Sequence, residues 1–392
     1  MELRELQHHI RMLATLEETS SPMVSCYINL ETNLVDARRT LKNQVQKISK
    51  GLPVHSHPEF DEAFRSIEKY LGNHFLSHTK GLALFTRSGP WPFWLALQFD
   101  VPLPNWLAVD TTPNIYHLVE LKDTYHRYVV MILTEEKVRI IEVNLGSVTE
   151  DVWRERPELR QRVGREWSRE HYQNHRRNRT DQFIKEQISI LEQLMSAGGH
   201  SHLILAGNPR LLARVRRELP KPLTDKLINS VVTAGSDKLS EVVAVTLSRF
   251  IEQEELESQA MVERLQRHIH TGGLAVIGTQ KTLKTLKLGQ VDVLLVAKNY
   301  SPSRGWKCLS CGEVRVRQPV LNKCADCNSA ELRSLDLREE IIRLAEQRGC
   351  QVEVVNQSEW LHRVGGVGAL LRYFVPEQHH ERQRSLLVSQ NA

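Results

Sequence analysis

The sequence lacks long hydrophobic runs, since no apolar stretch approaches the roughly 18 residues that a membrane-spanning helix requires. Its first residues, MELRELQHHIRML, are charged and lack the apolar segment of a secretory signal. We therefore expect a cytoplasmic protein that neither enters the secretory pathway nor inserts into a membrane.

The sequence also lacks the motifs of several enzyme classes. It contains no G-x-S-x-G turn, which positions the nucleophile of many serine hydrolases. The segment Gly278–Thr282 does not have the spacing of a phosphate-binding loop. His171 and His175 are four residues apart, but Tyr172 stands where the H-E-x-x-H motif of zinc proteases requires glutamate. These absences argue against all three classes.

The chain has little excess charge. Its 52 Lys and Arg residues nearly balance 47 Asp and Glu residues, which leaves a net charge of +5. Any nucleic-acid site must therefore be a local patch. With 392 residues, 41% of them hydrophobic, the chain is long enough for roughly two to four domains with separate cores.

One segment has the same net positive charge as the whole chain. Residues 154–179 contain nine arginines and four glutamates, a surplus of five positive charges, with aromatic residues between them. Guanidinium groups suit phosphates, and aromatic rings can stack on bases. Apolar periodicity is weak here, which predicts an exposed loop followed by the start of a basic helix. A solvated helix face with internal Arg–Glu pairs is the alternative.

We predict that this basic segment contacts RNA. The candidate contacts are Arg160, Arg162, Arg165, Trp167, Arg169, His171, His175, Arg176, Arg177 and Arg179. Phosphate contacts and complementary shape are enough for such binding, so the segment needs no catalytic residue.

Cysteine is scarce, and four of the six cysteines form two close pairs. Cys308 and Cys311 make one C-x-x-C knuckle, and Cys324 and Cys327 make the other. Because no export signal is present, a disulfide framework is not expected. Two such knuckles predict a structural Zn²⁺ site with four cysteine ligands, as in a zinc ribbon. Redox dithiols, or pairs that have lost their metal, are the alternative.

The residues around the knuckles fit a zinc ribbon. Gly312 and Asn328 follow the two pairs, and both residue types favour tight turns. Basic side chains nearby are candidate contacts to RNA or protein: Lys307, Arg315, Arg317 and Lys323. A closed four-cysteine site is structural and by itself says nothing about catalysis.

The order of apolar segments predicts an α+β unit followed by two α/β units. The predicted boundaries are 1–115, 116–270 and 271–376 for the three units, 305–330 for the zinc ribbon inserted in the third, and 377–392 for a disordered tail. Pro102–Trp106 predicts a loop, and Thr279 is the expected cap of a helix.

Several segments match the motifs of a known family. Residues 273–297, GLAVIGTQKTLKTLKLGQVDVLLVA, contain a glycine turn, an amphipathic helix ending in glycine and a V-D-x-L-L strand. Residues 364–373 read VGGVGALLRY. Both resemble the third domain of archaeo-eukaryotic class I release factors, whose archaeal members carry a zinc ribbon at the same place. Three earlier segments resemble the first two domains more faintly: 25–30 (SCYINL), 80–85 (KGLALF) and 202–209 (HLILAGNP).

This resemblance implies a three-domain release-factor-like architecture with an L7Ae/L30e-like third domain. The middle domain of the family reaches the peptidyl transferase centre of the ribosome, and the third contacts a translational GTPase. By this resemblance, the basic segment at 154–179 would lie against ribosomal RNA near the catalytic centre.

Two motifs of termination factors are missing. The sequence contains no Gly-Gly-Gln tripeptide, whose backbone and glutamine position the water that cleaves peptidyl-tRNA. The equivalent loop would lie near Arg162–Arg169. The stop-codon motif Asn-Ile-Lys-Ser is absent too, and Lys47–Lys50 is a poor substitute. Within the family, the chain therefore resembles Pelota and the Balon-like ribosome hibernation factors of bacteria.

The resemblance and the missing motifs predict a translation factor with no catalytic residues. It would occupy the A site of vacant or stalled ribosomes as a monomer, in hibernation or rescue, with elongation factor Tu or another translational GTPase as a candidate partner. One alternative is a ribosome-dependent peptidyl-tRNA hydrolase, in which Gly164, Arg165, His171 or Gln173 positions water. The other is an RNA-processing nuclease, which the lack of clustered carboxylates disfavours.

Overall fold

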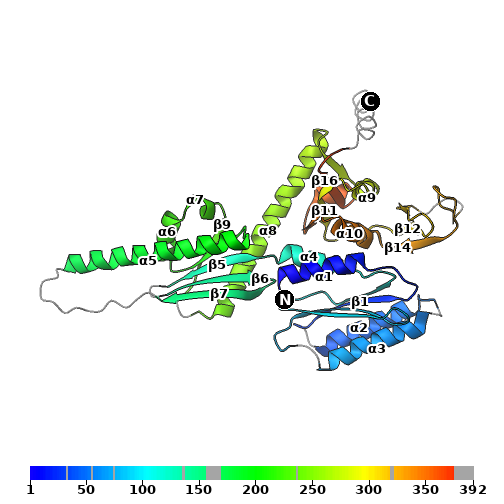
Figure 1. The fold of residues 1–392 in the computed structure, drawn as a ribbon, viewed down its shortest axis with the longest axis horizontal. Helices are drawn as coiled ribbons and strands as arrows, with labels where there is room; N and C mark the ends of the chain where they lie inside the picture. The colour runs from blue at the N-terminus through cyan, green and yellow to red at the C-terminus, as the bar shows by residue number, and fades with distance from the viewer. Residues whose placement is uncertain are drawn as a thin grey trace. The chain divides into compact units, whose positions relative to one another are not determined.

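The chain forms two compact units (Figure 1). The computed structural model describes residues 1–31, 34–53, 56–73, 76–134, 137–155, 169–234, 237–317 and 322–374. At 34, 73, 153–155 and 169–180 it describes the backbone alone. One unit contains residues 3–124 and the described residues from 255 onward, and the other contains residues 125–254.

Two sequence predictions are not decided by this division. The domain boundaries stay a prediction, and the tail at 377–392 lies outside the described residues. Among the helices described, none is long and apolar enough to cross a membrane.

The first unit contains a four-stranded antiparallel sheet in the order β3-β2-β1-β4. The strands are β1 (Met23–Asn29), β2 (Gly81–Arg87), β3 (Phe93–Phe99) and β4 (Trp106–Asp110). Helices α2 (Leu34–Ser49) and α3 (His57–Asn73) lie on one face, where Val24, Leu41 and Ile67 belong to a shared core. Alternate residues of the strands face this core, which is the period of a sheet covered by helices.

The first unit also contains a second four-stranded sheet, in the order β10-β16-β11-β15. Its strands are β10 (Ala275–Ile277), β11 (Val291–Ala297), β15 (Gln351–Val355) and β16 (Val367–Leu371), with helices α9 (Thr279–Lys287), α10 (Leu337–Gln347) and α11 (Glu359–Arg363). Strands β11 and β15 are parallel, whereas β16 is antiparallel to both of its neighbours.

Helix α10 connects the two halves of the first unit. It packs against α1 (Leu3–Thr15) and α4 (Tyr116–Thr124), which come from the amino-terminal part of the chain. Leu6, Ile10 and Leu13 of α1 are fully buried, and their spacing of three to four residues places them on one helix face. The amphipathic start of the sequence is therefore a packed helix of this unit.

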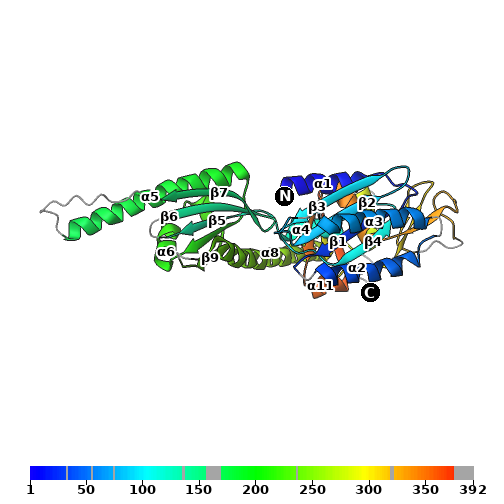
Figure 2. The same cartoon turned by 90° about the horizontal axis from the view of Figure 1, so that it is seen from below.

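The second unit is a five-stranded mixed sheet in the order β7-β6-β5-β8-β9 (Figure 2). Its elements are β5 (Tyr128–Leu133), β6 (Lys137–Asn144), β7 (Ser147–Glu155), α5 (Arg169–Gly198), β8 (Leu203–Gly207), α6 (Pro209–Glu218), α7 (Lys221–Thr224), β9 (Leu227–Val232) and the first part of α8 (Leu239–His270). Helices α5 and α6 supply the core on one face, and α8 supplies the core on the other. Strand β5 is apolar throughout because its alternate residues, such as Val129 and Val130, enter these two different cores.

The structure corrects several local predictions. Strand β4 begins at Trp106, the last residue of the loop predicted at Pro102–Trp106, and was not expected; β7 and β9 were not expected either. All three are short or polar strands that are fixed by pairing with β1, β6 and β8. Thr279 is the first residue of α9 and not its cap, because Gly278 takes the cap position with a φ of 82°. The Thr279 hydroxyl instead lies 2.8 Å from the Tyr300 hydroxyl.

Candidate metal centre and nucleic-acid interface

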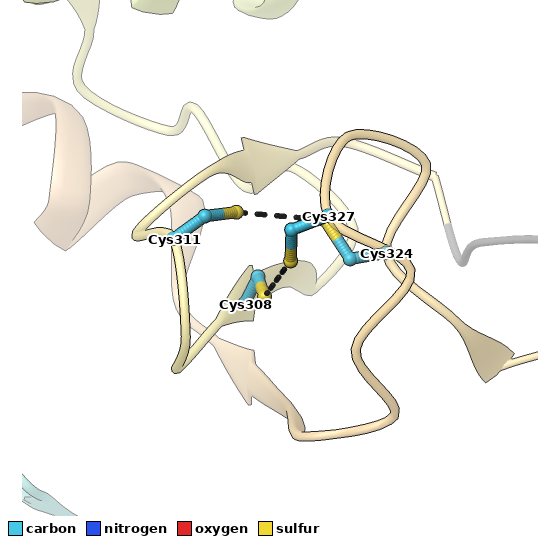
Figure 3. A group of neighbouring side chains, drawn as sticks. All are labelled: Cys308, Cys311, Cys324 and Cys327. Carbon is cyan, nitrogen blue, oxygen red and sulfur yellow. Dashed lines mark hydrogen bonds between the residues drawn. The ribbon is translucent and has the colours of Figure 1, made fainter.

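The zinc ribbon predicted from the sequence is a small three-stranded sheet with the four cysteines at one end (Figure 3). The strand order is β13-β12-β14, with β12 (Gly305–Cys308), β13 (Val314–Arg315) and β14 (Leu332–Leu335). Cys308 ends β12, and Cys311 lies in the turn between β12 and β13. Cys324 and Cys327 come from the segment before β14, so antiparallel pairing brings the second knuckle opposite the first.

The four sulfur atoms are close enough to bind one ion. The Cys308 and Cys327 sulfurs are 3.5 Å apart, and the Cys311 and Cys324 sulfurs are 3.6 Å apart. All four lie within 4.8 Å of one another. A tetrahedral zinc ion with Zn–S bonds near 2.3 Å places its sulfurs about 3.8 Å apart. The cysteines therefore fit a closed four-sulfur site, and a metal such as zinc can occupy it.

The two knuckles have the same backbone geometry. The N–H of Gly312 donates to the Cys308 carbonyl, and the N–H of Asn328 donates to the Cys324 carbonyl, both over 2.9 Å. Gly312 has a φ of 74° and Asn328 a φ of 59°, in the left-handed region that these two residue types tolerate best. The turn residues predicted from the sequence are confirmed, and they direct each pair of cysteines toward one point.

The electrostatics of the cluster favour a cation. The backbone N–H of Cys311 hydrogen-bonds to the Cys308 sulfur and, with further contacts from Cys327 and the N–H of Ser310, lowers the pKa of Cys308 to about 6. The backbone N–H of Glu313 favours the Cys311 thiolate, but desolvation and the neighbouring sulfurs together outweigh it and raise the pKa of Cys311 to about 12. Four adjacent sulfurs cannot all ionise alone, whereas a bound dication stabilises every thiolate.

Two of the four basic residues predicted around the ribbon, Lys307 and Arg315, have partners within the protein. Lys307 of β12 is ion-paired with Glu18, and Arg333 of β14 contacts the same carboxylate at 3.1 Å. Arg315 forms a two-pronged ion pair with Asp326 at 2.8 Å. The other two, Arg317 and Lys323, are exposed. Sequence reasoning missed Glu18 and Arg333, since they are distant in sequence and belong to no motif.

The predicted RNA-contacting residues fall on the first part of α5 and the segment before it. Arg160, Arg162, Arg165 and Trp167 lie outside the described residues. The backbone of α5 begins at Arg169, so the helix start predicted in the basic segment is present. The remaining candidates, on the first turns of α5, are described by backbone only: Arg169, His171, His175, Arg176, Arg177 and Arg179. Their contacts with RNA stay a prediction.

The second part of α5 is fixed to the sheet. Ile184, Ile188, Leu191 and Met195 recur at helical spacing, and they form an apolar face that lies in one core with β5, β6 and β8. Asp181 is ion-paired with Arg214 of α6 at 2.5 Å, which ties the middle of α5 to its neighbour. The helix has 30 residues, a length of about 45 Å at 1.5 Å per residue. The packed half can therefore hold the basic half in a defined direction.

Comparisons with known families agree with this arrangement. Residues 113–255 match Bacterial archaeo-eukaryotic release factor family 10, and residues 256–375 match eRF1 domain 3. Over these two stretches the chain is similar to release factors. The matched residues are a family 10 region followed by an eRF1 domain 3. The family resemblance inferred from the sequence motifs is confirmed.

Curated relatives match over part of their length. Peptide chain release factor subunit 1 of Thermococcus onnurineus is 30% identical over 158 residues, which are 36% of this chain and 38% of that protein. The protein of the same name from Archaeoglobus fulgidus is 28% identical over 131 residues, or 30% of this chain and 32% of that protein. The chain therefore matches less than two fifths of the length of these relatives.

Two solved structures cover nearly the whole chain. Pelota of Archaeoglobus fulgidus shares 15% identity and has a TM-score of 0.37, over 95% of this chain and 93% of that one. Archaeal Pelota in a ribosome-bound complex with ABCE1 shares 13% identity and has a TM-score of 0.41, over 95% and 94% of the two chains.

Proposed function

We propose that this protein occupies the A site of vacant or stalled ribosomes, in hibernation or rescue, and does not hydrolyse peptidyl-tRNA. The observation that carries the proposal is a release-factor chain without the Gly-Gly-Gln tripeptide. Without that loop the family's scaffold retains a means of binding but loses the group that positions the hydrolytic water. Delivery by a translational GTPase such as elongation factor Tu is part of this proposal, because the family uses its third domain for such contacts.

The basic segment supports binding to ribosomal RNA. Its surplus of five positive charges, within residues 154–179, equals the net charge of the whole chain. Between Arg169 and Gln182, α5 carries Tyr172 as its only large hydrophobic residue, so this half of the helix has no apolar face to bury in a protein core. Phosphates of structured RNA are natural partners for such a helix.

The first test is co-sedimentation with vacant bacterial 70S ribosomes at near-physiological salt, with and without elongation factor Tu and GTP. Stoichiometric binding in either condition is the expected result. If the protein stays in the supernatant in both, the ribosome is not its target and the proposal is wrong.

The basic segment is tested by replacing Arg176, Arg177 and Arg179 with glutamine. We expect weaker ribosome binding and a shallower dependence of affinity on salt, because fewer counterions are released. A matched control removes three exposed arginines from α6, a different helix of the same unit: Arg210, Arg216 and Arg217. Equal losses in the two triple variants would reduce the effect to net charge and remove the assigned role of the segment.

A peptide-release assay separates the non-catalytic function from a divergent hydrolase. Ribosomes carrying labelled peptidyl-tRNA are mixed with the protein under conditions where binding is established. Binding without release is expected. Rapid release that disappears when residues 162–169 are shortened would establish a peptidyl-tRNA hydrolase instead.

A further inference from the structure

A second group of side chains that could hold a metal ion lies within the second unit. His126 precedes β5, His202 precedes β8, and Glu254 lies on α8. Strands β5 and β8 are parallel neighbours, with Val129 opposite Leu203. The amino-terminal ends of both strands therefore lie at the same edge of the sheet, and α8 brings the carboxylate to that edge.

The distances within this cluster suit a common ion. The Nε2 atom of His126 is 3.2 Å from Glu254 Oε1, and the Nε2 atom of His202 is 3.5 Å from the same oxygen. One ligand atom from each residue lies within 4.8 Å of the other two. Zinc bonds to nitrogen and oxygen are 2.0–2.2 Å, so tetrahedral ligand atoms are about 3.4 Å apart.

The shared oxygen lacks a hydrogen bond. Glu254 Oε1 is buried, and none of the described residues donates a hydrogen bond to it, although two imidazole nitrogens lie nearby. A buried carboxylate oxygen without a donor is costly, because it has lost water and gained no replacement. A cation between the carboxylate and the two imidazoles would supply the missing partner.

Neighbouring residues orient the two histidine rings. Nδ1 of His202 is 2.8 Å from the Ser201 hydroxyl, which occupies this nitrogen and leaves Nε2 to face Glu254. Both rings contact the Phe250 ring edge to face, at centroid distances of 5.1 Å for His126 and 5.5 Å for His202. Metal-bound histidines are commonly oriented by such a hydrogen bond from the second ring nitrogen.

We propose that His126, His202 and Glu254 bind one zinc ion, in addition to the ion of the ribbon. Two imidazoles and one carboxylate are a donor set that zinc uses where a fourth position stays open to water. The ion would link α8 to the starts of β5 and β8. These three elements are distant from one another in the sequence. The alternative is a metal-free cluster in which Glu254 only neutralises a protonated histidine.

The first experiment is to measure zinc per chain in the full-length protein after saturation with Zn²⁺ and removal of loosely bound metal. We expect two equivalents in the wild type and one in the Glu254→Gln and His126→Asn variants. Glu252→Gln is the matched control, because it makes the same change on the same helix at an exposed side chain paired with Arg249. This control should keep two equivalents.

Cobalt substitution identifies the ligands independently of the variants. The ribbon should give sulfur-to-cobalt charge-transfer bands, and the second ion should add visible d–d bands without further charge transfer. Glu254→Gln should remove only the added bands and weaken binding of the second equivalent at least tenfold. One equivalent with a pure thiolate spectrum in the folded wild type would overturn the proposal, as would a second equivalent that survives Glu254→Gln unchanged.

Discussion

Glu18 and Lys307 form an ion pair although they are 289 residues apart in the chain. Glu18 follows α1, and Lys307 lies in β12 of the ribbon beside Cys308. The second oxygen of Glu18 contacts Arg333 of β14 at 3.1 Å, so one carboxylate bridges two ribbon strands. The ribbon is therefore fastened to the amino-terminal part of the first unit by charge as well as by its covalent connections.

We predict that Glu18→Gln loosens the ribbon. The change removes two charge-assisted contacts from a partly buried carboxylate and should cost about 1–2 kcal/mol of stability. Hydrogen exchange in β12 and β14 should accelerate in the variant. Glu17→Gln changes an exposed neighbour and serves as the control. Exchange rates in β12 and β14 that match in the two variants would contradict the bridging role.

The same contact should weaken in acid. Burial raises the pKa of Glu18, but the hydrogen bond and charge of Lys307, together with Arg333, outweigh burial and hold the pKa below its usual value of 4.5. A carboxyl with a lowered folded-state pKa stabilises the fold above about pH 4.5, and this contribution disappears as pH falls through the folded-state pKa. The difference in the free energy of unfolding between wild type and Glu18→Gln should therefore be largest at pH 7. It should disappear at a pH below the folded-state pKa of Glu18.

A second prediction concerns the ribbon metal. Cys311→Ser removes one ligand at an exposed position, so we expect the zinc content to fall by one equivalent per chain and β12–β14 to lose protection from exchange. Cys350→Ser is the matched control, because Cys350 lies outside the knuckles and its thiol donates to the Val291 carbonyl at 3.3 Å. Unchanged zinc in Cys311→Ser, measured on protein prepared without chelator, would exclude the four-cysteine site.

A third prediction follows from a buried carboxyl group in α10. Glu339 Oε2 accepts hydrogen bonds from the backbone N–H groups of Ile115 and Tyr116, at 2.9 and 3.2 Å, and so caps the start of α4. Burial raises the pKa of Glu339 to about 8, even though Arg338 and the two N–H groups oppose the shift. At neutral pH this carboxyl group is therefore largely protonated in the folded protein.

The raised pKa of Glu339 determines the direction of the pH effect. Because of Glu339, the folded state binds up to one more proton than the unfolded state between about pH 4.5 and 8. The contribution of Glu339 to stability is therefore greatest below this window and falls by up to roughly 1.4 kcal/mol per pH unit across it. Glu339→Gln is neutral at every pH and keeps a carbonyl acceptor. Urea unfolding should show the variant gaining on the wild type as pH rises from 5 to 8. Parallel stability curves would contradict the raised pKa.

The four-cysteine cluster of the ribbon was predictable because each pair is local in sequence. Each C-x-x-C pair with its turn residue is a complete unit, so spacing alone indicates the site. The His126, His202 and Glu254 cluster was not predictable, since its members become neighbours only through the pairing of β5 with β8 and the position of α8. Glu18 was missed for the same reason, because its partners are set by tertiary packing.

The fold, too, was predictable where the signal is local in sequence and not where it depends on tertiary packing. Helix α8 and the second part of α5 were predictable, because their apolar residues recur at helical spacing over several turns. The short strands β4 and β9 were not, because five or six residues give too little periodicity and their pairing partners are distant in sequence. The basic segment is distinguished by its charge and not by its apolar periodicity. The prediction that it contacts RNA therefore rests on its amino-acid composition alone.

The last prediction concerns Gly207, in the L-I-L-A-G segment that ends β8. Its φ is 146°, and a Cβ atom placed there would lie 2.2 Å from the backbone oxygen of Leu133 in the neighbouring strand. Because a strand backbone cannot move aside easily, Gly207→Ala should destabilise the second unit by about 2–3 kcal/mol. Gly199 also has a positive φ, 65°, but nothing lies within 4 Å of its added Cβ atom, so Gly199→Ala should cost only about 1 kcal/mol. Urea unfolding of both variants separates steric overlap from backbone strain, and equal losses would show that the close approach to Leu133 is unimportant.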